Sequence, residues 1–130
     1  MDVPAGTIQG KVWGDTQRVF ASDSVVVELC HAKAGWRCST HHHAARANLF
    51  HVVSGELVVR ALKDGLWDAT ALSAGQQTTI LPGVEHRFEA HQDVTFLEVY
   101  FRAPLDAQDI VRRDQGGPIA SAVLPAVRDL

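Results

Sequence analysis

The chain has 130 residues, enough for one domain with a hydrophobic core and too few for two well-packed ones. Apolar residues make up 46% and charged residues 21%, which is the composition of an ordinary globular protein. The formal net charge is -3, whereas nucleic-acid-binding proteins are typically basic. We therefore expect no nucleic-acid partner.

Cysteine usage and hydropathy bear on where the protein works. No apolar run approaches the roughly 20 residues that a membrane-spanning helix needs. The first residues, MDVPAG, lack the basic and then apolar stretch of a secretory signal. Cys30 and Cys38 are the only cysteines, which is typical of a reducing compartment where disulfides do not persist. We therefore expect a cytoplasmic protein with no membrane partner.

Short runs rich in β-branched residues predict strands along most of the chain. In chain order these runs cover residues 24–32, 48–62, 76–81 and 93–101. Turn-forming residues separate them, at Ala34-Gly35, Ser54-Gly55, Lys63-Asp64-Gly65, Ser73-Ala74-Gly75 and Pro82-Gly83. The Lys63-Asp64-Gly65 turn predicts a hairpin between the segments on either side. No helical periodicity is sustained between Val3 and Pro104, so the pattern indicates an all-β sandwich or barrel.

The sequence changes character after Pro104. Residues 105–118 are polar, break at Gly116-Gly117 and leave room for one short helix. Residues 119–130 are apolar enough to pack against another surface, including that of a second subunit. The chain shows no repeat, linker or low-complexity tract. We therefore predict a single domain over residues 1–130, with 104–130 as a C-terminal segment.

The chain contains seven histidines, three of them consecutive. Alternate side chains of a strand share one face, so we expect His41 and His43 to point one way and His42 the other. Two imidazoles on one face can bind the same metal ion. His86 is the third candidate ligand, because the Pro82-Gly83 turn places it near the start of a strand that faces inward.

The spacing around these histidines resembles the first motif of the cupin superfamily, G-x5-H-x-H-x3,4-E-x6-G. Gly35, His41, His43 and Gly55 fall in register, with Asn48 in place of the glutamate. This first motif covers residues 35–55.

The second cupin motif, G-x5-P-x-G-x2-H-x3-N, is matched over residues 75–90. Gly75, Gly83 and His86 fall in register, while Leu81 and Ala90 differ from the motif. The resemblance implies an all-β cupin fold, a double-stranded β-helix or jelly-roll barrel. It also implies a homodimer and one divalent metal ion, whose ligands here would be His41, His43 and His86.

A narrower resemblance concerns the cupin domain of type II mannose-6-phosphate isomerases. It rests on residues 50–59, 81–89 and 109–117, which read FHVVSGELVV, LPGVEHRFE and DIVRRDQGG. It implies a metal-dependent enzyme that acts on a small carbohydrate-like substrate.

Two residues are candidates for a further role at the metal. Asn48 has two possible roles, as a weak ligand through its amide oxygen or as a group behind the ligands that orients a histidine or a bound water. His51 has the opposite strand parity and should face outward, although a register shift would make it a fourth ligand. His42 should also face outward.

The remaining candidates concern the cavity. We expect Cys30 and Cys38 to be small buried residues rather than nucleophiles. Phe50 and Phe88 share parity with Asn48 and His86 and should line the cavity. Four arginines are candidates to bind a phosphorylated or carboxylated substrate, or to be solvated surface residues: Arg46, Arg87, Arg112 and Arg113.

These patterns leave three functions open. The first is a metal-dependent enzyme acting on carbohydrate-like or hydroxy-acid substrates, which predicts a cavity lined with arginine, lysine or hydroxyl groups. The second is a three-histidine, iron-dependent dioxygenase, consistent with the missing glutamate. The third is a non-catalytic module that binds a small molecule. The ion can be Zn, Fe, Mn or Ni, and no catalytic residue is assigned from the sequence.

Overall fold

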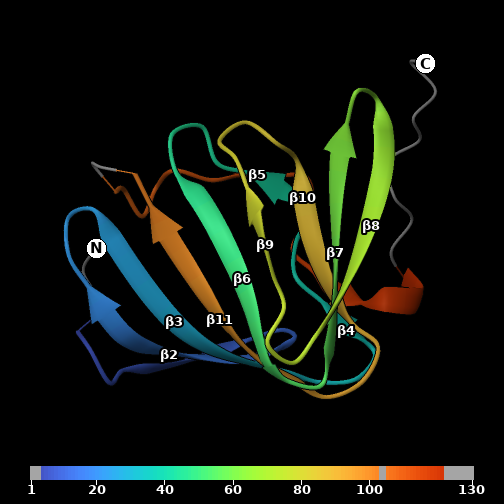
Figure 1. Cartoon of the computed structure of the whole chain (residues 1–130), viewed down its shortest axis with the longest axis horizontal. Coiled ribbons are helices and arrows are strands. Elements are labelled where there is room, and N and C mark those ends of the chain that lie inside the picture. Colours follow the sequence, from blue (N-terminus) through green and yellow to red (C-terminus); the bar gives the residue numbers. More distant parts are fainter. Residues whose placement is uncertain (1–3, 103–104, 122–130) are drawn as a thin grey trace.

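The computed structural model describes residues 4–102 and 105–121. Two antiparallel sheets make up this part of the chain (Figure 1). The first sheet contains, in spatial order, β1 (Ile8–Lys11), β2 (Gly14–Ala21), β3 (Val25–Ala32), β11 (Val94–Phe101), β6 (Ala47–Ser54) and β9 (Gln77–Ile80).

The second sheet contains several strands of only two residues. Its order is β12 (Val111–Arg112), β5 (His41–His42), β10 (His86–Ala90), β4 (Trp36–Arg37) and β13 (Gly117–Pro118). β7 (Glu56–Lys63) also pairs with β10, and β8 (Leu66–Ser73) pairs with β7. The predicted all-β jelly-roll architecture is confirmed by this arrangement of two antiparallel sheets.

The core forms between the inner faces of the two sheets. Buried and half-buried side chains alternate along β3 and β7, the pattern of strands with one face inward. Aromatic side chains meet in this core, where Trp13 packs edge-on against Phe88 with ring centroids 4.8 Å apart. Phe88 in turn lies 5.0 Å from Phe96, so the two sheets are joined by a continuous aromatic contact.

The predicted hairpin between β7 and β8 is present. Its eight cross-strand pairs run from Glu56–Ser73 to Lys63–Leu66, with Asp64 and Gly65 alone in the turn. Both turn residues have positive φ, 52° and 78°, as a two-residue turn that matches the twist of the strands requires. The Asp-Gly dipeptide therefore sets the register of this hairpin.

The short helix expected within residues 105–118 is not formed. This segment instead lies along the second sheet, where β12 pairs with β5 and β13 pairs with β4. Side chains hold it there, because Asp109 accepts hydrogen bonds from backbone amides of residues 44–46 and Asp114 pairs with Arg37 at 2.9 Å. These long-range partners outweigh the local propensity on which the expectation of a helix rested.

A 3-10 helix, η1 (Ile119–Ser121), ends the described part of the chain. The predicted packing of residues 119–130 falls mostly on residues 122–130, which lie outside it. No helix in residues 4–102 and 105–121 is long and apolar enough to cross a lipid bilayer.

Candidate metal centre

One strand pairing and one loop hydrogen bond bring the cupin-motif histidines together. His41 opens β5 and His86 opens β10, and the two residues are direct partners across this antiparallel pair. His43 follows β5, and its carbonyl accepts a hydrogen bond of 2.7 Å from the amide of Gly83 in the second motif. The turn before His86 is thus tied to the strand that carries the other two histidines.

The three imidazoles converge inside the fold. Their ring centroids are 4.6 to 5.5 Å apart, and one ligand atom from each lies within 4.8 Å of the others. His41 is 7% exposed, His43 2% and His86 0%. His42 lies outside this group and pairs with Val111 on β12, so the expected strand phase is confirmed.

Each ring is held by a hydrogen bond at Nδ1. The acceptors are backbone carbonyl oxygens, of Ser39 at 2.8 Å for His41, of Asp109 at 2.7 Å for His43 and of Val84 at 2.9 Å for His86. A carbonyl oxygen can only accept, so Nδ1 of His41 and of His86 must carry the proton. In His43 the Nε of Arg46 also approaches Nδ1, at 3.1 Å, and we assign the proton to Nδ1 because the contact with the carbonyl of Asp109 is shorter, at 2.7 Å. The lone pair is therefore on Nε2 in all three histidines.

These three Nε2 atoms are buried and have no hydrogen-bond partner within the described residues. An unsatisfied buried polar atom costs about 1–3 kcal/mol, and three of them converge on one point. Lone pairs directed at a shared position are what a divalent ion requires of its histidine ligands. The residues present therefore fit a metal ion.

The pKa values of the three histidines favour their neutral form. Burial lowers the pKa of His43 and of His86 to about 4, with further lowering by neighbouring positive charge. Burial and the two neighbouring histidines hold the pKa of His41 well below its usual range. The rings are therefore neutral near pH 7, and a metal ion would not have to displace protons from Nε2.

The other two candidate ligands, Asn48 and His51, differ in their surroundings. Asn48 is fully buried on β6, where its Nδ2 donates to Oε2 of Glu98 at 2.7 Å and its Oδ1 has no hydrogen-bond partner among the described residues. His51 is on the opposite face of the same strand and contacts the side chain of Gln77 at 3.0 Å. The predicted outward orientation of His51 is thus confirmed.

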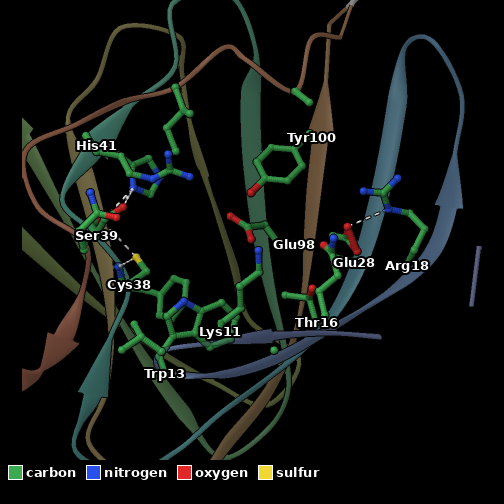
Figure 2. Close-up of a pocket in the computed structure, with 18 of the residues that line it drawn as sticks. Lys11, Trp13, Thr16, Arg18, Glu28, Cys38, Ser39, His41, Glu98 and Tyr100 are labelled. Carbon is green, nitrogen blue, oxygen red and sulfur yellow. Dashed lines mark hydrogen bonds and ion pairs between the residues drawn. The ribbon is translucent and has the colours of Figure 1, made fainter. Parts of the chain in front are cut away.

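A cavity of about 530 Å³ reaches the cluster at His41 (Figure 2). Its volume is in the range of sites for small molecules. Figure 2 shows Lys11, Thr16, Glu98 and Tyr100 around the same hollow. Polar and basic groups therefore line a space next to the histidines.

Glu98 and Tyr100, on β11, are site residues that the sequence analysis missed. Glu98 lies inside the fold, where burial raises its pKa to about 7 although a hydrogen bond with Tyr100 opposes this shift. Strand alternation contains the signal, since Glu98 is in phase with the core residues Val94 and Phe96. A carboxyl with such a pKa can hold or release a proton at neutral pH.

The structure separates the four candidate arginines into two pairs. Arg46 and Arg112 line the cavity. Arg87 instead forms a buried ion pair with Glu89 at 2.6 Å, and Arg113 pairs with Glu85.

Of the two phenylalanines, Phe88 lines the cavity, as expected. Phe50 does not, and packs in the core with its ring centroid 6.2 Å from that of His86. Both cysteines are buried and free, and burial raises the pKa of each thiol, so neither is a thiolate.

A sandwich of two antiparallel sheets with three histidines converging inside it is the arrangement of a cupin. Residues 28–100 match the cupin domain family. The match covers more than half of the chain, and the chain belongs to this family. No relative was found among curated proteins.

Solved structures with the same fold include several of oxalate decarboxylase from Bacillus subtilis. Its structure at pH 4.6 has a TM-score of 0.72 at 14% identity, and that of one of its single-residue mutants 0.73 at 15%. A further structure of this enzyme, from a study of its Mn(II) centres, has a TM-score of 0.70 at 15% identity. The similarity covers 82–83% of this chain and 30% of the decarboxylase chains. At this identity the likeness concerns the fold.

Proposed function

We propose that the protein binds one divalent metal ion through Nε2 of His41, His43 and His86, and uses it to act on a small molecule. The observation that carries the proposal is the set of three buried, unpartnered Nε2 atoms whose tautomer is fixed by three carbonyls. A bound ion would supply Lewis acidity or an activated water there. All three ligands are neutral, so the ion would keep its full double charge. Zn, Fe, Mn and Ni remain the candidates.

The reaction we favour is metal-dependent chemistry on a small carbohydrate-like or hydroxy-acid substrate, of the isomerase kind. Its support is the cavity wall, which carries Lys11, Arg46, Thr16 and Tyr100 beside the histidines. Glu98 adds a carboxyl whose pKa is about 7, so this residue can accept and return a proton within the same cavity.

An iron-dependent dioxygenase is the second candidate. The observation that favours it is the amide of Asn48 at the motif's glutamate position, which leaves the group formed by the histidines without an acid in the described part of the chain. Turnover with iron(II) and oxygen, and none with zinc, would select it. A saturable ligand with no turnover under any metal would select the binding module instead.

The family resemblance leads us to propose a homodimer, and the two free thiols support the proposal that the protein works in the cytoplasm. Among the described strands, β1 and β9 each pair on one side only, and a second copy is one way to cover such an edge. Light scattering on the purified protein tests the dimer, because a monomer mass would contradict it.

Elemental analysis of protein purified without chelators tests the metal proposal. We expect about one equivalent of metal in the wild type and in His42→Ala, and little in His86→Ala. His42→Ala is the matched control because its ring lies outside the cluster. Unchanged metal content in a folded His86→Ala, or metal loss in His42→Ala, would refute the assignment.

A further inference from the structure

Arg46 is a buried cation at the edge of the histidine cluster. It lies between His43 and the start of β6, lines the cavity and is only 5% exposed. A charge taken out of water at such a site requires a counter-charge or hydrogen bonds to most of its donors. The partners of Arg46 therefore decide whether the site is complete.

The contacts of the guanidinium within the chain are few. Its central carbon lies 4.1 Å above the ring of Tyr100, and Nη1 donates a long hydrogen bond of 3.4 Å to the carbonyl of Asp106. Nε lies 3.1 Å from Nδ1 of His43, but that nitrogen carries the proton donated to Asp109. Two N–H groups that face each other make no hydrogen bond, so this contact leaves Nε without an acceptor.

The nearby acids make their hydrogen bonds with other groups, although the charges of Asp109 and Glu98 still interact with that of Arg46. The carboxylate of Asp109 accepts three backbone amides, those of Ala44, Ala45 and Arg46, at 2.7 to 3.1 Å. Glu28 pairs with Arg18 at 2.7 Å, and Glu98 is bound by Asn48 and Tyr100. Among the residues that the structure describes, no carboxylate forms an ion pair with Arg46.

A second cation faces the same space. Arg112 lies opposite His41 in the β5–β12 pair and lines the cavity, and it too has no ion pair within the described residues. The histidine end of the cavity is therefore cationic, while the end formed by β3 and β11 holds acids and bases in equal number, Glu28 and Glu98 with Arg18 and Lys11. A carboxylate needs only the two arginines at the histidine end, and its uncharged part can lie toward this mixed end.

We propose that the cavity binds a small carboxylate ion, held by Arg46 and Arg112 next to the histidine cluster. Arginine suits this task because its planar donor pair matches a carboxylate. The rest of such a ligand would face Thr16, Tyr100 and Glu98, which offer hydrogen bonds to hydroxyl groups. The inference deepens the proposed function and rests on it for the position of the ligand beside an ion.

Calorimetry with charged and neutral partners of one shape tests the inference. The probes are acetate, glycolate and lactate, each against its amide, titrated into metal-treated wild type, Arg46→Met, Arg112→Met and Arg113→Met. We expect at least one acid to bind the wild type about tenfold or more tightly than its amide. Arg46→Met should remove this preference, and Arg112→Met should reduce it several-fold. Arg113→Met is the control and should keep it, because Arg113 lies outside the cavity and pairs with Glu85.

Two results would overturn the inference: equal binding of acid and amide in all three pairs, or a preference that survives in both Arg46→Met and Arg112→Met. Because Arg112 is exposed, its variant keeps the test decisive if Arg46→Met does not fold. Metal content measured in the same samples separates the two proposals. Bound metal without an acid preference leaves the metal proposal standing, and an acid preference without bound metal refutes the metal proposal alone.

Discussion

Asn48 occupies the position at which the first cupin motif has its glutamate, and its amide donates to Glu98 on the neighbouring strand. The acid of this region is thus carried by β11 instead of β6. Glu98 does not belong to the group formed by the three histidines. The amide nitrogen of Asn48 holds the carboxyl of Glu98, while its Oδ1 is buried without a hydrogen-bond partner among the described residues.

Glu98 should leave a signature in the pH dependence of stability. Its pKa is about 7 in the folded state and has the ordinary value of 4.5 in the unfolded chain. Between these pH values the folded state keeps the proton that the unfolded state has lost, so the free energy of unfolding falls as pH rises. The contribution disappears in Glu98→Gln. We expect wild type to lose up to about 3 kcal/mol relative to Glu98→Gln across this window.

Urea denaturation of the two metal-free proteins at a series of pH values measures this difference. The neutral histidines contribute equally to both proteins, so their own titration cancels. A difference in the free energy of unfolding that stays constant from pH 4.5 to 7 would contradict the assignment.

Among the secondary-structure elements, the segment 105–118 supports the metal centre from outside. The backbone carbonyl of Asp109 fixes the ring of His43, and its side chain holds residues 44–46. We expect Asp109→Ala to weaken metal binding about tenfold, because partners behind metal ligands contribute at this level. Competition with a chromophoric chelator measures the affinity. Asp68→Ala, which removes an exposed pair with Lys63 in the hairpin, should leave it unchanged.

The first cupin motif requires a glycine at position 55, between β6 and β7, because the backbone there leaves no room for a side chain. The φ of Gly55 is 85°, and a Cβ there would lie 2.5 Å from the carbonyl oxygen of Asp93. Gly75 has a φ of 84° but open space around it. We expect Gly75→Ala to cost about 1 kcal/mol from backbone strain alone, and Gly55→Ala about 2 kcal/mol more. Chemical denaturation measures both losses of unfolding free energy. Equal losses would contradict the prediction, because they would mean that the backbone at Asp93 moves away from the new Cβ at little cost.

The sequence predicted the elements whose signals are local. Strand alternation, the Asp64-Gly65 turn and the register of the two motifs were enough to place His41, His43 and His86 together. The path of residues 105–118 was mispredicted because its partners, Arg37 and the amides of residues 44–46, are remote in sequence. Glu98 was missed although strand alternation places it in phase with Val94 and Phe96, because its partners Asn48 and Arg46 are remote in sequence and give a lone acid no local sign of a role.

At the scale of the whole molecule, the fold and the ion should be thermodynamically linked. An ion that binds only the folded state, at a concentration a hundred times its Kd, adds about 2.7 kcal/mol of stability. For a chain of this size that corresponds to a Tm increase of about 8 °C. Thermal melts of chelator-treated protein with and without Zn²⁺ or Mn²⁺ measure the increase, which should be absent in His86→Ala. A wild-type Tm that neither ion changes would contradict the linkage.

The carbonyls of Ser39, Val84 and Asp109 also have an energetic consequence for the metal-free protein. By fixing the rings during folding, they leave three lone pairs that nothing in the described structure satisfies. Apolar side chains of similar size would suit an empty interior better, so the metal-free fold is locally frustrated at this one place. A lineage selected for stability alone would be expected to exchange these histidines for leucine or phenylalanine. Three histidines in this arrangement are therefore a feature that the stability of the metal-free fold does not explain.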